Sequence, residues 1–134
     1  MNVEKLEKPK AEWRKLLPAA AYSVLFEART EPPFSSPLDK ETRRGTFACA
    51  ACHLPIFSSN AKFDSGTGWP SFWEALPNAV AIATDDSLGM TRDECHCRRC
   101  GGHLGHLFHD VPDQPKNNRY CMDGLALKFI PKAA

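Results

Sequence analysis

The sequence has no long uninterrupted apolar stretch and almost no net charge. The longest apolar run of the first thirty residues, around Leu16 to Phe26, is broken by Pro18, Tyr22 and Ser23 and does not follow a basic segment. It therefore predicts neither a signal peptide nor a membrane span. The 17 basic residues nearly balance the 16 acidic ones, for a formal charge of +1. So small a net field gives no compositional support for binding nucleic acid or an anionic membrane.

Internal repeats and low-complexity segments are also missing, and 134 residues are too few for two domains of ordinary size. We therefore expect one domain, 1–134, with a helical segment over 1–30 and a body over 31–134. Apolar residues at helical spacing from Lys10 to Ala28, with Pro18 suited to the first turn of a second helix, predict two short N-terminal helices. The three prolines from Glu31 to Pro37 prevent a helix from continuing and predict an extended segment across the surface.

The rest of the sequence has short runs of strand character, separated by Gly, Pro, Asn and Asp. These runs are Gly45 to Cys49, Ala79 to Ala83, Gly89 to Cys95 and Ala126 to Ile130. The body is therefore predicted to be mainly β.

Cysteine is plentiful, and four of the six cysteines form two Cys-x-x-Cys pairs, Cys49/Cys52 and Cys97/Cys100. Each pair would supply two thiolates from one tight turn. Together they predict a closed four-cysteine shell, so its zinc would be structural and would tie two distant parts of the β body together. Iron in the same shell is one alternative, and two disulfides or four unrelated buried thiols are another. Thiolates that stay available for metal suit a reducing compartment, and we expect the cytoplasm.

Cys121 is a cysteine that neither pair claims, and it lies downstream of His103 and His106. A reactive cysteine needs to be a thiolate, which a nearby cation favours, and Arg119 would share a face with Cys121 in a strand. Because His103 and His106 are three residues apart, they would converge in a helical or turn geometry, and the glycines around them favour a tight turn. Taken alone, such histidines are more often structural, and a lone cysteine such as Cys95 is usually a small buried hydrophobe.

Three segments resemble the signatures of the B class of methionine sulfoxide reductases. They are Gly68-Trp69-Pro70-Ser71-Phe72, His103-Leu104-Gly105-His106-Leu107-Phe108 and Arg119-Tyr120-Cys121. The resemblance runs from about Trp13 to about Phe129, with the two Cys-x-x-Cys pairs in the same order. It implies two antiparallel β-sheets with short N-terminal helices alongside, and reduction of the R epimer of methionine sulfoxide, free or in proteins. We expect a monomer.

The resemblance assigns catalytic roles that suit the residue types. Attack on a sulfoxide sulfur needs a thiolate, and the departing oxygen must be protonated. By resemblance, Cys121 attacks and becomes a sulfenic acid, which a second thiol then reduces. His103 and His106 would manage protons and position the oxygen.

Trp69, Phe108 and Arg119 are the expected substrate-binding residues. The indole of Trp69 would form an apolar wall for the methyl group and could also donate a hydrogen bond. The alternative is a zinc-stapled β module that binds a ligand around Trp69 without turnover. A nucleic-acid-binding zinc module is a third reading, supported by Arg43-Arg44 and Arg98-Arg99 and opposed by the near-neutral charge.

The sequence departs from the family pattern near the nucleophile. Asp123, which we include among the catalytic residues, stands where family members usually carry Asn. Its carboxylate would either disfavour the Cys121 thiolate or hold a histidine in its protonated form. Thr67 stands where many members place a resolving cysteine. We therefore expect thioredoxin, glutathione or another small thiol to reduce the sulfenic acid directly, and a transient disulfide between Cys95 and Cys121 is the alternative.

Overall fold

The computed structural model describes residues 5–6, 8–27, 29–85 and 92–132. Its first elements are the two predicted helices, α1 (Lys10–Leu16) and α2 (Ala19–Glu27). Leu17, between them, is extended at φ −113° and ψ 147°, because a residue that precedes proline is pushed out of the helical region. Trp13 of α1 stacks on Phe26 of α2, with ring centroids 5.4 Å apart. Neither helix, nor any other in the described ranges, is long and apolar enough to cross a bilayer.

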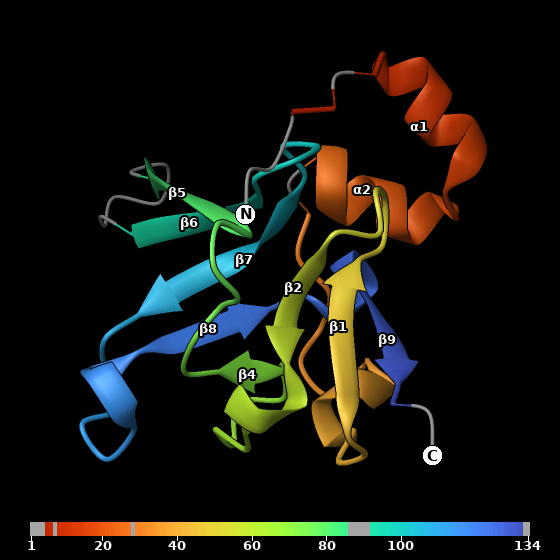
Figure 1. Ribbon diagram of the computed structural model, residues 1–134. Helices are drawn as coiled ribbons and strands as arrows, with labels where there is room; N and C mark the ends of the chain where they lie inside the picture. Colours follow the sequence, from red (N-terminus) through yellow and green to blue (C-terminus); the bar gives the residue numbers. More distant parts are fainter. Residues whose placement is uncertain (1–4, 7, 28, 86–91, 133–134) are drawn as a thin grey trace.

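Two antiparallel sheets form the body, with the helices packed at one end (Figure 1). The smaller sheet has the strand order β2-β1-β9, and the larger has the order β3-β4-β8-β7-β6-β5. The strands are β1 (Gly45–Cys49), β2 (Pro55–Ser58), β3 (Lys62–Phe63), β4 (Ser71–Phe72), β5 (Val80–Asp85), β6 (Arg92–Cys97), β7 (His103–Phe108), β8 (Arg119–Met122) and β9 (Leu127–Pro131). Short 3₁₀ helices lie between strands and before β1: η1 (Pro37–Lys40), η2 (Ser59–Ala61), η3 (Pro115–Asn117) and η4 (Gly124–Ala126). The predicted mainly β fold with two antiparallel sheets is confirmed.

The predicted strands correspond closely to observed ones. The run from Gly45 to Cys49 is β1, and the runs that begin at Ala79 and Ala126 are β5 and β9, shifted by one or two residues. Residues 89–91 of the run from Gly89 to Cys95 lie outside the described residues, and β6 begins at Arg92.

The tight turn expected at His103 and His106 is wrong, because both histidines lie in β7. An irregularity in strand pairing explains how they still converge. Cys95 pairs with Gly105 and His96 pairs with His103, so β7 carries one more residue than β6 at this point. Such a bulge interrupts the two-residue alternation of side chains. The two histidines therefore project to the same face, with ring centroids 5.4 Å apart.

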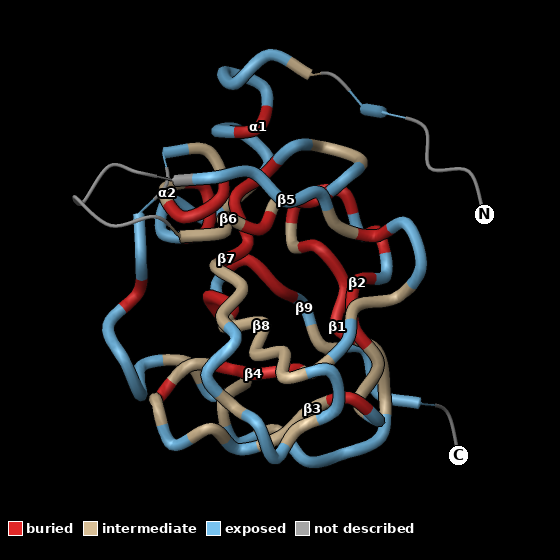
Figure 2. The backbone as a smooth tube through the Cα atoms, turned by 90° about the vertical axis from the view of Figure 1, so that its left-hand side faces the viewer, coloured by how far each residue is buried: buried red, intermediate tan, exposed pale blue. Residues whose placement is uncertain are grey.

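Aromatic rings join the two sheets in the core. Phe72 of β4 stacks on Phe57 of β2 with centroids 4.2 Å apart, and it meets Phe47 of β1 edge to face at 5.0 Å. All three side chains are fully buried, and Figure 2 shows buried backbone along β1, β2, β4 and β7. Such ring pairs contribute about 0.5–1.5 kcal/mol each beyond the area that they bury. They fix the two sheets face to face and so support the strands that carry the site.

Gly105 marks a close approach between β7 and β8. A Cβ at this position would collide with the carbonyl oxygen of Cys121 and would lie 2.8 Å from the Cα of Met122. Because both obstacles are backbone, the strands would have to separate. We expect Gly105→Ala to lower the free energy of unfolding by about 3 kcal/mol, the upper end of the usual cost of overpacking. Urea denaturation would measure the loss.

Gly66→Ala is the matched control. Gly66 has a φ of +77°, but a Cβ there meets nothing within 4 Å. Its replacement should therefore cost only the backbone strain, about 1 kcal/mol. Equal losses for the two variants would show that the contact between β7 and β8 does not constrain the fold.

Candidate active site

Cys121 lies in a row of paired residues that crosses the larger sheet. It pairs with Ser71 of β4 on one side and with His106 of β7 on the other, and His106 pairs in turn with Glu94 of β6. Residues that pair directly across neighbouring strands project to the same face. The strand register therefore brings a cysteine, a histidine and a carboxylate together, although they are far apart in the sequence.

A cavity of about 200 Å³ opens beside Cys121. Its wall contains Thr30, Thr67, Trp69, Arg92, Gly105, His106, Phe108, Arg119, Cys121 and Asp123. Most of the predicted catalytic and substrate-binding residues thus meet around one space. His103 is the exception, because it lies behind the wall and is only 4% exposed. Larger hollows elsewhere have walls without cysteine or histidine.

The thiol of Cys121 is protonated in the resting site. Burial raises its pKa to about 11, against the opposing effect of the Arg119 guanidinium. The carboxylate of Asp123 raises this pKa further, and a hydrogen bond with Thr67 lowers it. Arg119 thus lowers the pKa of Cys121, as predicted, but burial raises it by more.

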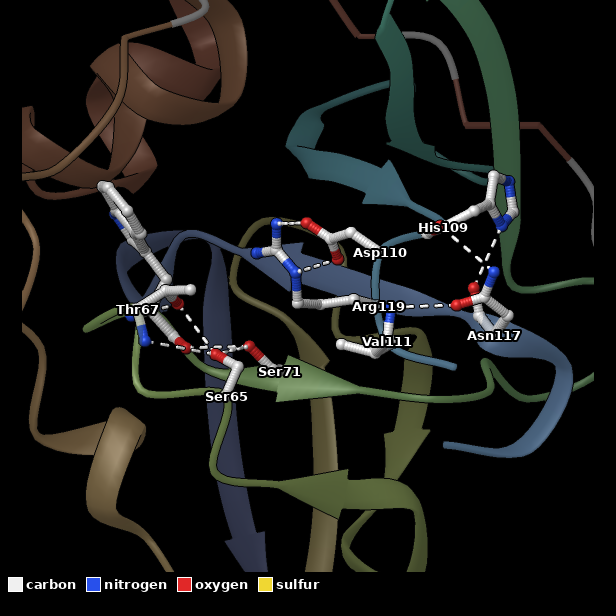
Figure 3. Close-up of polar contacts among 9 residues, drawn as sticks. Ser65, Thr67, Ser71, His109, Asp110, Val111, Asn117 and Arg119 are labelled. Carbon is white, nitrogen blue, oxygen red and sulfur yellow. Dashed lines mark hydrogen bonds and ion pairs between the residues drawn. The ribbon is translucent and has the colours of Figure 1, made fainter. Parts of the chain in front are cut away.

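Arg119 is held in place by two hydrogen bonds to one carboxylate. Its Nε donates to Oδ1 of Asp110 and its Nη2 donates to Oδ2, both at 2.9 Å (Figure 3). The guanidinium carbon also lies 4.3 Å from the centre of the Phe108 ring. The Arg119 side chain is 11% exposed and that of Asp110 is 57% exposed, so the carboxylate covers the guanidinium from the solvent side. This pairing keeps one positive charge at a fixed place beside Cys121.

Hydroxyl groups form a chain that leads to the thiol. The Oγ atoms of Ser71 and Ser65 are 2.8 Å apart, and the Oγ of Ser65 is 2.8 Å from Oγ1 of Thr67 (Figure 3). Thr67 in turn makes the hydrogen bond that lowers the pKa of Cys121. Thr67 is therefore next to the thiol.

The segment around Glu31 fixes two residues of the cavity wall. The indole N–H of Trp69 donates to the Glu31 carbonyl at 3.0 Å, so this donor serves the chain itself and leaves the ring face for the cavity. The Glu31 N–H donates to Oδ1 of Asp123 at 3.1 Å. The Glu31 carboxylate is buried and accepts from the Leu125 N–H at 2.8 Å, while its Oε2 has no hydrogen-bond partner. Sequence reasoning missed this role, because it treats Glu31 only as the start of an extended segment.

His103, behind the cavity wall, forms a buried pair with Asp123, which belongs to that wall. Oδ2 of Asp123 lies 3.9 Å from Nδ1 of His103. Burial raises the pKa of Asp123 to about 7, and the charge of Glu31 adds to the increase. Burial lowers the pKa of His103 to about 4, although the Glu94 carboxylate opposes this. Near pH 7, therefore, His103 is neutral and Asp123 is partly protonated. The sequence predicts two alternative effects of Asp123. Its carboxylate raises the pKa of Cys121, and it does not hold His103 in the charged form.

Cys95 lies on the other face of the sheet from Cys121. It pairs with Gly105, which pairs with Met122, and both Cys95 and Met122 are fully buried. Because Cys121 and Met122 are neighbours in β8, they project to opposite faces. Burial also raises the pKa of Cys95 to about 12. Cys95 is thus a core residue whose side chain points away from Cys121.

The four paired cysteines gather at the ends of β1 and β6 and in the turns that follow these strands. Their sulfur atoms all lie within 4.8 Å of one another, with Cys49 and Cys100 3.6 Å apart and Cys52 and Cys97 3.5 Å apart. Sulfurs around a tetrahedral zinc, each about 2.3 Å from the ion, are separated by about 3.8 Å. A disulfide would need about 2.0 Å, and all six cysteines are free. The four-cysteine cluster therefore fits a metal ion, and the alternative of two disulfides is wrong.

Hydrogen bonds among these thiols separate their acidities. The contact with Cys100 lowers the pKa of Cys52 and raises that of Cys49.

The fold and the site together define a class: a two-sheet β protein with four cysteines that could hold a metal ion and a buried thiol beside histidines, as suits an oxidoreductase. The family model described as the SelR domain matches residues 17–131. The chain is 47% identical over 128 residues to the peptide methionine sulfoxide reductase MsrB of Leifsonia xyli subsp. xyli, with 95% of this chain and 92% of that protein covered. It is 48% identical over 126 residues to the protein of the same name from Thiobacillus denitrificans, with 93% and 95% covered. The chain therefore belongs to the peptide methionine sulfoxide reductase MsrB family, a family of oxidoreductases.

A solved structure, the Mis18 "Yippee-like" domain, shares the fold at much lower sequence similarity. It has a TM-score of 0.55 and 19% identity, and it covers 69% of this chain and 100% of its own. At this identity the likeness concerns the fold alone.

The Asp123 carboxyl should make stability depend on pH. Its folded pKa of about 7 lies above the ordinary value of 3.8, so between these values the folded protein binds more protons than the unfolded chain. Stability is therefore lost as the pH rises through 7. We expect the stability advantage of Asp123→Asn over the native chain to grow by roughly 3 kcal/mol from pH 4 to pH 8. Urea denaturation across this pH range measures it.

Asp110→Asn is the control with the opposite sign. Arg119 lowers the pKa of Asp110, so that carboxylate stabilises the fold at high pH and its removal should cost stability there. A difference between Asp123→Asn and the native chain that stays constant with pH would contradict the buried acid.

Proposed function

We propose that this protein reduces the R epimer of methionine sulfoxide, free or in proteins, and that Cys121 is the nucleophile. The observation that carries the proposal is the pairing of Cys121 with His106 beside a cavity walled by Trp69, in a chain of the MsrB family. The names of the relatives suggest the substrate class. The register between β7 and β8 suggests that Cys121 and His106 react together.

The reaction transfers one oxygen atom and two electrons. Sγ of Cys121 attacks the sulfoxide sulfur, the S–O bond breaks, and the oxygen ends on Cys121 as a sulfenic acid. The sulfoxide is reduced by two electrons to methionine, and the cysteine is oxidised by two. The thiol proton that is lost when Sγ attacks is recovered on the departing oxygen.

The histidines suit this transfer of a proton from thiol to oxygen. His106 borders the cavity in register with Cys121, so it acts as the base for the thiol and then as the acid for the oxygen. His103 lies behind His106, and its Nδ1 faces Asp123. His103 and Asp123 position His106, and the partly protonated Asp123 carboxyl is a nearby source of a proton.

The two walls of the cavity give a reason for stereoselectivity. The Trp69 ring offers apolar surface for the S-methyl group, whereas His106 and Arg119, which lies against Phe108, offer polar groups to the oxygen. The R and S epimers exchange the places of oxygen and methyl around sulfur. One epimer alone can therefore place both groups on matching walls while sulfur faces Cys121.

An external thiol, thioredoxin or a small thiol such as glutathione, completes the cycle. Cys95 is fully buried on the far face, and Thr67 occupies the place of the usual resolving cysteine, which supports direct reduction of the sulfenic acid. We further propose that the four-cysteine cluster holds zinc as a structural cross-link between β1 and β6, and that the protein works as a cytoplasmic monomer in one domain.

A single turnover without reductant tests the mechanism. We expect the protein to consume one equivalent of the R epimer and none of the S epimer, with oxidation found by mass spectrometry on Cys121 alone. Cys121→Ser should abolish consumption, and Cys95→Ser should leave it unchanged. A disulfide between Cys95 and Cys121 would make Cys95 the resolving thiol. Binding without consumption of either epimer would instead favour the ligand-binding module.

Thr67→Cys should convert the external cycle into an internal one. The Thr67 hydroxyl already bonds to the Cys121 thiol, so a thiol at this position is placed to attack the sulfenic acid. We expect one turnover of Thr67→Cys to end in a disulfide between Cys121 and the introduced cysteine, and thioredoxin-supported turnover to rise at least severalfold. Thr30→Cys, at another position of the cavity wall, is the control. A stable sulfenic acid in Thr67→Cys would refute the placement.

A further inference from the structure

We propose that Glu94, His103 and His106 form a second metal site, which binds a divalent transition ion such as zinc. The three residues each offer a ligand atom, and these atoms all lie within 4.8 Å of one another. The site is distinct from the four-cysteine cluster, because it uses nitrogen and oxygen donors and lies beside the cavity that Cys121 borders.

The strand pairing builds this cluster. Glu94 of β6 pairs with His106 of β7, and the bulge turns His103 to the same face. Nε2 of His103 lies 3.8 Å from Oε1 of Glu94, which is too long for a hydrogen bond. It is close to the spacing of about 3.4 Å between two ligand atoms that each lie about 2.0–2.1 Å from a tetrahedral ion. A small inward movement of side chains would complete the coordination.

The surroundings support the donor set. Nδ1 of His103 is buried without a hydrogen-bond partner, and Oδ2 of Asp123 lies 3.9 Å from it, so the same small movement would give His103 the carboxylate support that metal-bound histidines have. His96 Nε2 contacts Oε1 of Glu94 at 2.8 Å, so it orients this carboxylate. Two imidazoles with one carboxylate are typical of zinc sites that keep one open position, whereas Ca²⁺ and Mg²⁺ prefer oxygen alone.

The consequence for activity is inhibition, and this consequence rests on the proposed function. An ion on Nε2 of His103 and on His106 would withhold both imidazoles from proton transfer. Because His106 also borders the cavity, the open coordination position would face the space where the substrate binds. Free zinc would thus stop reduction without disturbing the fold.

Cobalt gives a direct test of the site. Protein whose four-cysteine cluster already holds zinc is titrated with Co²⁺, and bound metal is counted by equilibrium dialysis while visible absorption is recorded. We expect one Co²⁺ per chain, with d–d bands and no sulfur-to-cobalt charge-transfer band. Glu94→Gln, which keeps the shape of the side chain, should weaken Co²⁺ binding at least tenfold, and His103→Gln provides a second variant.

Asp93→Asn is the matched control, because this neighbouring carboxylate lies 3.9 Å from the exposed His109 and should not affect binding. Unchanged affinity in Glu94→Gln and His103→Gln, or a charge-transfer band from sulfur, would overturn the site. Zinc should also reversibly block the single turnover of the native protein. Cobalt binding in a protein that reduces neither epimer would uphold the site and refute the proposed function. Cobalt binding with turnover that zinc leaves unchanged would refute the inhibitory role.

Discussion

At the four-cysteine cluster, the end of a strand from one sheet lies against the end of a strand from the other. Cys49 ends β1 of the smaller sheet and Cys97 ends β6 of the larger one, and their partners lie in the turns that follow. The shortest sulfur contacts, Cys49 with Cys100 and Cys52 with Cys97, join one pair to the other. A bound ion would therefore hold the end of β6 against β1. Because β6 pairs with β7 and β7 pairs with β8, this junction lies two strands away from the pairing of His106 with Cys121.

A second constraint comes from the segment that leads out of the helices. Its Glu31 backbone bonds to both Trp69 and Asp123, and its carboxylate bonds to the backbone of Leu125. One residue thus connects two side chains of the cavity wall, the Trp69 ring and the buried acid Asp123. Backbone groups vary little in position, which gives these two side chains fixed places without a dedicated helix or strand. The proline-rich sequence suits this task, because prolines restrict the extended path of the segment.

Much of this arrangement follows from sequence, and the exceptions have physical causes. Paired cysteines and proline positions act locally, so the four-cysteine cluster and the two helices could be predicted. The sequence correctly predicted that His103 and His106 lie close together, but it attributed this to a tight turn. Their spacing suits a turn, yet they lie in a strand whose bulge depends on pairing with β6. The part played by Glu31 was also hidden, because it depends on contacts with residues 38 and 92 positions away. Strand register and long-range backbone contacts are not encoded in a short motif.

Burial favours the neutral forms of Cys121, His103 and Asp123. The pKa of Cys121 is raised to about 11, that of His103 is lowered to about 4, and that of Asp123 is raised to about 7. A resting thiol is a poor target for oxidants, since the thiolate is the reactive form. On the proposed mechanism the sulfoxide brings its own proton acceptor, the oxygen that must be protonated as it leaves. Proton loss from Cys121 is then coupled to arrival of the substrate, and the same burial that suppresses side reactions makes the thiol selective for a ligand that can accept its proton.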